Sequence, residues 1–269
     1  MNYILIRGGG DLASGVAVRL HRVGFHVIIS ELPNPLAVRR TVSFSEAIYE
    51  KKWKVESITA ELVSTPDEIE RVLVQNEIPI LIDPELQLLD SSHFPLSSIV
   101  DARLIKKSYP PIPPDSPFTI GLGPGFTVGE NCHAVIETNR GHTLGRVYWT
   151  GSASADTGQP EGDPRRVLRA PADGILTGYA QIGDHVEGGQ LIAEVGREKI
   201  IAPFKGVLRG LIRPGVIIPK GLKIGDIDQR DDPGYCFMAS DKALAVGGGV
   251  LEAILSRPEI RAQLLNTSF

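Results

Sequence analysis

The first residues of the chain place a short apolar run directly before three glycines and the start of a helix. The segment Tyr3–Ala13 reads YILIRGGGDLA. Glycines permit a tight turn and let the backbone approach a ligand closely, and the helix start that follows offers unpaired N–H groups to an anion. The segment therefore predicts a strand–turn–helix unit, the building block of a parallel α/β sheet.

The glycine spacing also fits a dinucleotide-binding fingerprint, G-x-G-x-x-A, and predicts a phosphate site at Gly8, Gly9, Gly10 and Asp11. Glu31 ends the second apolar run, twenty-one residues after Gly10, where an acid can bind a ribose hydroxyl. A purely structural turn remains an alternative, because such turns also bring a helix close to a sheet. The Asp11 carboxylate would repel a phosphate unless its charge is used elsewhere. Its alternative role is to cap a helix from Leu12 to Val23.

Residues 1–108 alternate strand and helix signals, which predicts a Rossmann-like α/β domain with a parallel sheet. Two capping boxes, Ser43–Glu46 and Thr65–Glu68, predict helix starts. Asp83 and Asp101 end apolar runs, where we interpret them as caps and turn formers rather than ligand residues.

Residues 109–165 are predicted to be a proline-rich connector and a β segment with a glycine-rich loop. Five prolines lie between Tyr109 and Pro117, which is typical of a stiff, extended segment. The loop Ile120–Phe126 follows, and Gly123 and Gly125 are candidate ligand-facing residues on its turn. A structural bend is the open alternative.

Residues 166–230 contain an internal repeat. Ala170–Leu176 recurs as Ala202–Leu208, an offset of 32 residues that continues through later glycines and apolar positions. Two copies of strand, turn and strand predict a mainly β, two-fold sandwich, and the pattern resembles the biotinyl/lipoyl-like (barrel-sandwich hybrid) fold. That family carries its prosthetic group on a hairpin lysine, but Lys199 stands too close to Ala202, so no covalent biotin or lipoate is expected.

Residues 231–269 are predicted to form a C-terminal helix that packs back on the sheet domain. Leu251, Ile254 and Leu255 have helical spacing. Gly247, Gly248 and Gly249 precede them, and we prefer close helix packing over an anion-binding turn as their role.

Composition narrows the function classes. The chain has 269 residues, a net charge of −4 and no dense basic tract, so no nucleic-acid partner is expected. The two cysteines, Cys132 and Cys236, exclude a disulfide framework and suit the cytoplasm. No apolar run approaches the ~20 residues of a membrane span. Cys132 and His133 do not have metal-ligand spacing, so no metal site is predicted, and both cysteines are more typical of small buried residues.

The ordered set of segments resembles one family, the YqeB-type accessory proteins of the selenium-dependent molybdenum hydroxylase system. The segments that carry the resemblance are Arg7–Gly15, Glu31–Glu50, Val100–Leu104, Ile120–Phe126, the segments around His133 and His142, and Asp241–Leu255. The resemblance implies a bacterial, cytoplasmic maturation factor akin to XdhC-type chaperones, which handle the molybdenum cofactor. It implies no catalytic residue, so the catalytic residues are unknown and an enzymatic role is not favoured.

The resemblance also implies the partners: a molybdenum hydroxylase or its maturation proteins, with a small phosphate-bearing ligand. The ligand is left open between a molybdopterin-type cofactor and NAD(P). Arg39 and Arg40 suit bidentate phosphate contacts, with a solvated basic pair as the alternative. An NAD(P)-dependent oxidoreductase and a scaffold that binds no ligand remain alternative functions, and a homo-oligomer remains open.

Overall fold

The computed structural model describes residues 3–89, 93–107, 110–156, 158 and 162–266, which form two compact units. The sheet unit comprises the described residues of 1–35, 44–157 and 239–269. The repeat unit comprises those of 36–43 and 158–238. Two features of this division differ from the expected one. Residues 110–156, expected as a separate connector and β segment, belong to the sheet unit, and residues 36–43 belong to the repeat unit.

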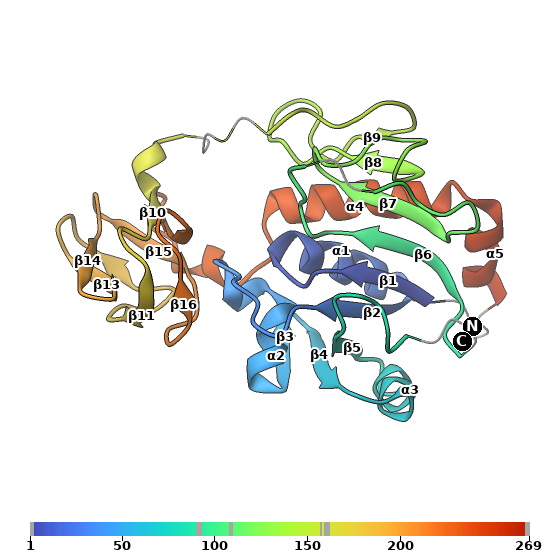
Figure 1. Ribbon diagram of the computed structural model, residues 1–269, viewed down its shortest axis with the longest axis horizontal. Coiled ribbons are helices and arrows are strands. Elements are labelled where there is room, and N and C mark those ends of the chain that lie inside the picture. Colours follow the sequence, from blue (N-terminus) through green and yellow to red (C-terminus); the bar gives the residue numbers. More distant parts are fainter. Residues whose placement is uncertain (1–2, 90–92, 108–109, 157, 159–161, 267–269) are drawn as a thin grey trace. The chain divides into compact units, whose positions relative to one another are not determined.

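The sheet unit is built on one nine-stranded sheet with the order β3-β4-β5-β2-β1-β6-β7-β8-β9 (Figure 1). The strands are β1 Tyr3–Arg7, β2 His26–Glu31, β3 Lys52–Val55, β4 Ile58–Val63, β5 Ile78–Ile82, β6 Leu96–Asp101, β7 Phe118–Leu122, β8 Ala134–Ile136 and β9 Val147–Tyr148. From β4 to β8 all neighbours are parallel, and only the edge strands β3 and β9 pair antiparallel. This is the parallel-rich α/β sheet that the sequence predicts, with an additional β3–β4 hairpin that the sequence did not reveal.

Helices cover both faces of this sheet. They are α1 Asp11–Arg22, the 3-10 turn η2 Phe44–Glu46, α2 Ala47–Glu50, α3 Pro66–Val74, α4 Asp241–Leu255 and α5 Pro258–Asn266. The crossovers β1–α1–β2 and β4–α3–β5 run in opposite directions along the sheet, and right-handed crossovers then place α1 and α3 on opposite faces. Helices α1 and α4 pack against each other, and α3 buries Ile69 and Val72 in a core cluster with Leu5, Ile28 and Phe94.

The glycines of α4 let this helix approach its neighbours closely. A Cβ atom on Gly247 would lie 2.8 Å from the carbonyl oxygen of Gly15 in α1, and one on Gly249 would lie 2.2 Å from that of Gly145. Gly15 is equally restricted, because its Cβ would lie 2.6 Å from the Cβ of Ala243. These glycines serve helix packing, as we preferred from the sequence.

The two predicted capping boxes have different outcomes. The Thr65 hydroxyl oxygen accepts from the Glu68 N–H, and the Glu68 carboxylate accepts from the Thr65 N–H, so this box is confirmed. Helical turns also follow Ser43, with η2 from Phe44 and α2 to Glu50, although the first turn is a 3-10 turn and the buried Ser43 hydroxyl donates to the Arg39 carbonyl oxygen. Asp11 is not the N-cap of α1; Gly10 holds that position and Asp11 is the first helical residue.

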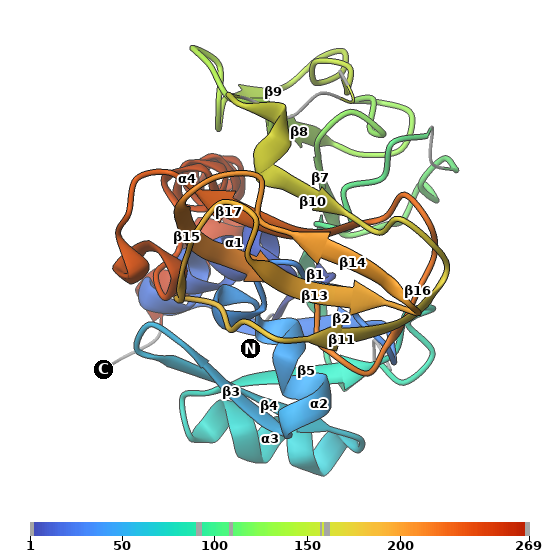
Figure 2. The same ribbon diagram turned by 90° about the vertical axis from the view of Figure 1, so that its left-hand side faces the viewer.

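The repeat unit contains two four-stranded sheets, β10-β17-β15-β12 and β14-β13-β11-β16. The elements are η1 Arg40–Val42, η3 Pro164–Arg166, β10 Val167–Arg169, β11 Gly174–Gly178, β12 His185–Val186, β13 Leu191–Val195, β14 Glu198–Ile201, β15 Gly206–Leu211, β16 Ile217–Ile218, β17 Lys223–Asp228 and η4 Pro233–Cys236. Figure 2 shows β11, β13 and β14 side by side in the second sheet.

The internal repeat is visible in these sheets. The first copy supplies β10 to β13 and the second supplies β14 to β17, each strand displaced by about 32 residues from its counterpart. Each sheet takes two strands from each copy, so the copies interleave. One apolar core, with Leu176 and its counterpart Leu208 fully buried, joins the two sheets. Neither copy can bury its apolar face without the other. This mutual dependence explains why the apolar positions of the two copies correspond along the whole repeat.

Candidate functional site at the carboxyl end of the parallel sheet

The strand order identifies the place where a ligand of this sheet is expected. The chain leaves β1 toward β2 on one side, whereas β6, the other neighbour of β1, continues toward β7 and β8 on the opposite side. In open α/β sheets, ligands bind at such a switch point, in the crevice outside the carboxyl ends of the strands. In this sheet that place is formed by the residues following Arg7 in β1 and Asp101 in β6.

The first half of the glycine turn is occupied by the chain itself. Gly8 has a positive φ of 95° and donates to the carbonyl oxygen of Ser30. The N–H of Gly9 donates to Oε2 of Glu31 at 2.6 Å, and its carbonyl oxygen accepts from the Ser45 N–H at 2.9 Å. A Cβ on Gly9 would lie 2.9 Å from the Ser45 nitrogen, so no ligand can approach this glycine from that side.

Glu31 fixes this turn from the end of β2. Its two carboxylate oxygens accept hydrogen bonds from the backbone N–H groups of Gly9 and Leu32, at 2.6 and 2.7 Å. The side chain is buried, and burial raises the pKa of Glu31 against the opposing effect of these two hydrogen bonds. A ribose hydroxyl would have to compete with both backbone groups for this carboxylate.

The second half of the turn is open. A Cβ on Gly10 would meet no atom within 4 Å. Gly10 is the N-cap of α1 with an extended backbone, and no side chain caps this helix start. Because the first N–H groups of a helix lack partners within the helix, an uncapped, accessible start attracts anions. Asp11 follows in the first turn, where a carboxylate interacts favourably with the helix dipole.

Arg7 and Asp101 form a charged pair beside the turn that sequence reasoning missed. Arg7 Nη2 donates to the Pro84 carbonyl oxygen at 2.8 Å, and Arg7 Nη1 lies 3.9 Å from Asp101 Oδ2. Arg103 binds the same carboxylate in bidentate fashion, with Nε and Nη2 at 2.9 and 2.5 Å from its two oxygens. In the sequence, the one feature that pointed to this pair was Arg7 itself, a charged residue at the end of an otherwise apolar strand.

This pair borders a cavity of about 240 Å³ beneath the proline-rich segment. The cavity is lined by Arg7, Ile99, Asp101, Pro110, Pro111, Ile112, Pro113, Ser116, Thr119, Phe126 and Asn131. The prolines expected to form a linker therefore cover the sheet beside the ends of β1 and β6. Backbone N–H groups, a guanidinium and a carboxylate equip this edge to bind and orient a polar ligand.

Two further acids at this edge hold their own loops. The Asp83 carboxylate accepts from the backbone N–H groups of Gln87 and Leu88, at 2.8 and 2.9 Å. Glu137 accepts from the N–H of Asn139 and from both the N–H and hydroxyl of Ser154. Burial raises the pKa of Glu137, but these hydrogen bonds outweigh it and hold the pKa below its ordinary value. Such acids order the loops after the strands, which agrees with our interpretation of Asp83.

The second glycine-rich loop is packed rather than open. A Cβ on Gly121 would lie 2.1 Å from the Phe126 ring, and one on Gly125 would lie 2.3 Å from the Ile105 carbonyl oxygen. Gly123 has a positive φ of 87°, and its Cβ would lie 3.0 Å from Thr138 Oγ1. The loop lies at the end of β7, but its glycines approach the protein's own chain.

Arg39 and Arg40 lie in the repeat unit and bind backbone carbonyl groups there. Arg39 is buried and donates to the carbonyl oxygens of Tyr235 and Met238, at 3.0 and 3.3 Å. Arg40 donates to that of Leu211 at 3.2 Å. These contacts give both arginines a structural role in attaching residues 36–43 to the repeat unit.

The cysteines are buried, as expected from the sequence. Burial raises the pKa of the Cys132 thiol to about 11, and burial also raises the pKa of the Cys236 thiol, so both resist ionisation. His133 uses Nδ1 to accept from the Thr119 N–H. Within the described ranges, no three His, Cys, Asp or Glu side chains form a metal-binding group.

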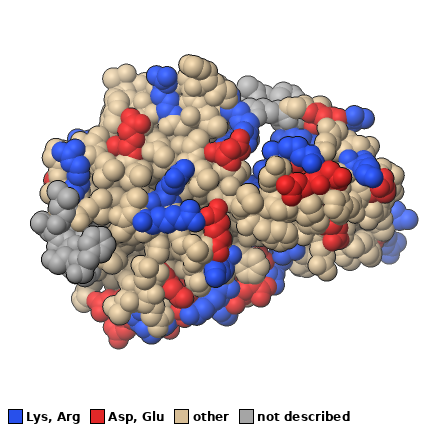
Figure 3. Space-filling view, turned by 180° about the vertical axis from the view of Figure 1, so that it is seen from behind, with Lys and Arg blue, Asp and Glu red and all other residues tan. Residues whose placement is uncertain are grey.

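The surface seen in Figure 3 mixes lysine and arginine with aspartate and glutamate. In the part of the chain that the structure covers, no helix is long and apolar enough to cross a membrane.

The fold and site together define the chain as an α/β protein with a parallel-rich, Rossmann-like sheet and an uncapped helix start at its switch point. No protein-family model matches it. It is 45% identical over 256 residues to the Escherichia coli (strain K12) protein called "Uncharacterized protein YqeB", over 94% of this chain and 47% of that protein. The chain therefore spans about half the length of this curated relative.

Two solved structures are distantly similar. An aspartoacylase family protein from Mesorhizobium loti shares 13% identity at a TM-score of 0.27, covering 84% of this chain and 85% of that one. The product-bound ectoine utilization protein EutE (DoeB) from Ruegeria pomeroyi shares 12% identity at a TM-score of 0.24, covering 83% of this chain and 56% of that one. Similarities at these TM-scores support no conclusion about this chain.

Proposed function

We propose that the chain is an accessory protein of a selenium-dependent molybdenum hydroxylase system that binds a phosphate-bearing ligand at the start of α1. The observation that carries the binding role is Gly10, an N-cap without a side-chain cap whose Cβ position meets no described atom within 4 Å, at the switch point of a parallel sheet. The accessory role rests on the resemblance of the ordered segments to the YqeB-type family, and similarity to YqeB itself supports that resemblance.

The ligand class follows from the chemistry of the edge. The helix start suits a phosphate, and the cavity that Arg7 lines offers both polar and apolar groups for the remainder of a pterin or nucleotide. A nicotinamide-dependent oxidoreductase is the weaker alternative, because Glu31 already uses both oxygens on the protein backbone. We further propose that the protein acts in the cytoplasm.

The repeat unit, in this proposal, has a biotinyl/lipoyl-like fold and serves to dock a partner protein. Its interleaved sheets support the fold assignment. The hairpin of β13 and β14 turns at Gly196 and Arg197, whereas Lys199 lies inside β14, opposite Glu194. A lysine within a strand is not at the tip, where that family carries its prosthetic group, so the unit is proposed to act without biotin or lipoate.

Native mass spectrometry of protein purified from a host that makes molybdenum cofactor tests the binding role. We expect a bound mass of a pterin phosphate or a nucleotide in the unaltered protein and its loss in Gly10→Val. Gly248→Val is the matched control, because Gly248 also has open space around its Cβ position but lies in α4. Ligand-free protein, or equal retention by both variants, would contradict the proposal. A bound NAD(P) would favour the oxidoreductase instead.

A further inference from the structure

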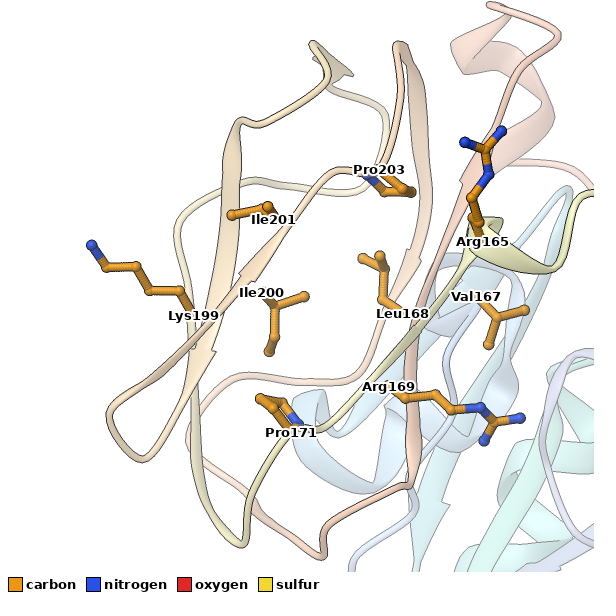
Figure 4. Close-up of a pocket in the computed structure, with 9 residues that line it drawn as sticks. All are labelled: Arg165, Val167, Leu168, Arg169, Pro171, Lys199, Ile200, Ile201 and Pro203. Atoms are coloured by element: carbon orange, nitrogen blue, oxygen red, sulfur yellow. The ribbon is translucent and has the colours of Figure 1, made fainter.

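The repeat unit carries a groove between the edge strands of its two sheets. Strand β10 is the edge of one sheet and β14 the edge of the other. Between them lies a cavity of about 240 Å³, at the bottom of which Leu168 and Ile200 face each other across the gap (Figure 4). Both of these side chains belong to the buried core, so the groove has an apolar base.

The internal repeat builds this groove. Eight of its nine lining residues form four pairs separated by 32 positions, namely Val167 with Lys199, Leu168 with Ile200, Arg169 with Ile201, and Pro171 with Pro203. Figure 4 shows the two strands running in opposite directions, with Pro171 and Pro203 at opposite ends of the groove. The groove therefore lies on the pseudo-two-fold axis that relates the two copies.

This arrangement places one cationic side chain on each flank of the groove. In Figure 4, Lys199 extends outward from β14 and Arg169 extends outward from β10, on opposite sides of the gap. Ile201 leaves 54% of its surface exposed, although it is a large apolar residue.

The charges on the lining are of one sign. Arg165, Arg169 and Lys199 line the groove, and none of the described residues of its lining is an aspartate or glutamate. Asp163 neutralises Arg165 through a bidentate pair. Arg169 donates to a neutral group, the Gly221 carbonyl oxygen at 3.0 Å. The groove thus has positive charge on each flank, from Arg169 and Lys199, and a carboxylate is the complement of each.

We propose that this groove binds an extended, acidic peptide segment of a partner protein by β-strand addition. A strand edge offers backbone hydrogen bonds to an added strand, and pockets along it select alternate side chains. The inference deepens the docking role proposed for this unit and is independent of ligand binding at Gly10.

Fluorescence anisotropy with labelled synthetic peptides tests this inference on the full-length protein. The probe is an acetylated seven-residue peptide that alternates glutamate and valine, and the comparison peptide replaces each glutamate by lysine. We expect saturable binding of the acidic peptide alone, weakened roughly three- to tenfold in Lys199→Glu and in Arg169→Glu, since each reversal replaces an attraction by a repulsion. Both residues are exposed, so these variants are expected to fold.

Two controls separate strand addition from general charge attraction. Arg197→Glu makes the same charge change at the exposed hairpin turn, outside the groove lining, and is expected to leave binding unchanged. An acidic peptide N-methylated at each valine keeps its charges but cannot donate those backbone hydrogen bonds, and we expect it not to bind. Equal binding of the methylated peptide, equal effects of Arg197→Glu and Lys199→Glu, or no binding at all would overturn the inference. Gly10→Val is expected to bind the peptide as the unaltered protein does. This measurement separates a failure of the groove proposal from a failure of the ligand-site proposal.

Discussion

Two glycine-rich turns follow strands β1 and β7 of the same sheet, and they differ in what fills the space beside their glycines. At the first turn, Gly10 has open space where a side chain would be. At the second, Gly121 and Gly125 are in contact with Phe126 and with the backbone around Ile105. Both segments look alike in the sequence, yet only the first leaves the Cβ position of one of its glycines clear of the described atoms. The comparison teaches that a glycine motif can accept a ligand only where distant parts of the chain leave it uncovered.

The first turn itself contains both kinds of glycine. Gly9 is held between Glu31 and Ser45, whereas its neighbour Gly10 faces open space. One glycine fixes the shape of the turn and the next is available to a ligand. Substitutions at single glycines can therefore separate folding from binding.

The largest effect is expected for Gly125→Ala. The added Cβ would lie 2.3 Å from the Ile105 carbonyl oxygen and 2.9 Å from that of Lys107, and backbone atoms cannot move aside as a flexible side chain can. We expect the free energy of unfolding to fall by about 3 kcal/mol, measured by urea denaturation. A loss as small as that of an exposed glycine would show that the second turn is open like the first.

A smaller loss is expected for Gly9→Ala. Its Cβ would lie 2.9 Å from the Ser45 nitrogen and 3.3 Å from Glu31 Oε2, so the turn must shift and weaken its hydrogen bonds. We expect a loss of about 2 kcal/mol in the free energy of unfolding. A variant as stable as the unaltered protein would place Gly9 with Gly10 among the open positions.

Glu31→Gln sharpens the role of the carboxylate that closes the first turn. Glutamine has one acceptor oxygen for two backbone N–H groups, so we expect a loss of about 1 kcal/mol from the unsatisfied donor. Denaturation of both proteins at matched pH values measures this loss.

The same pair of proteins also tests the direction of the Glu31 pKa. Burial raises this pKa above its ordinary value of 4.5, so the folded protein holds the proton more tightly than the unfolded chain. The resulting stability is fully present below about pH 4.5 and is lost as the pH rises through the folded-state pKa. The advantage of the unaltered protein over Glu31→Gln should therefore shrink toward neutral pH. An advantage that grows with pH would mean that the two hydrogen bonds dominate.

The smallest effect on stability, and of opposite sign, is expected for Gly10→Ser. Serine is a preferred N-cap, and the extended backbone of Gly10 suits it. We expect α1 to gain roughly 0.5 kcal/mol, while the new hydroxyl occupies N–H groups that a phosphate would use. Thermal unfolding and ligand retention in native mass spectrometry should then change in opposite directions. A loss of both thermal stability and ligand retention would mean that Gly10, like Gly9, is needed for the structure of the turn.

The sequence identified elements whose own residues decide their conformation. The apolar runs of β1, β2 and β5 and the capping box at Thr65 are such cases. The hairpin of β3 and β4 was missed because its strands mix polar and apolar residues, as an exposed sheet edge allows. Ser43 has the same box pattern as Thr65, but it is buried and its hydroxyl donates to the Arg39 carbonyl oxygen, a contact that the box pattern does not reveal.

The candidate site was only partly readable from sequence for the same reason. Gly8 to Gly10 and Glu31 were found because a motif joins them, and the structure brings Gly9 and Glu31 into contact. Arg7 was missed because it meets Asp101 only after β1 and β6 pair. Arg103 binds Asp101 from two residues further along the chain, a contact that sequence reasoning did not consider. Whether the space beside Gly10 is filled depends on distant parts of the chain, so a local sequence pattern cannot predict it.

Residues 36–43 belong to the repeat unit although they lie far from the rest of it in the sequence, and this affects how the protein folds during synthesis. Val38 lies against Gly210, and Thr41 Oγ1 donates to the Cys236 carbonyl oxygen. During synthesis this octapeptide leaves the ribosome long before the strands that it covers. The repeat unit can be completed only once its last residues have emerged, and a gene fragment beginning at position 158 would encode it without one of its parts.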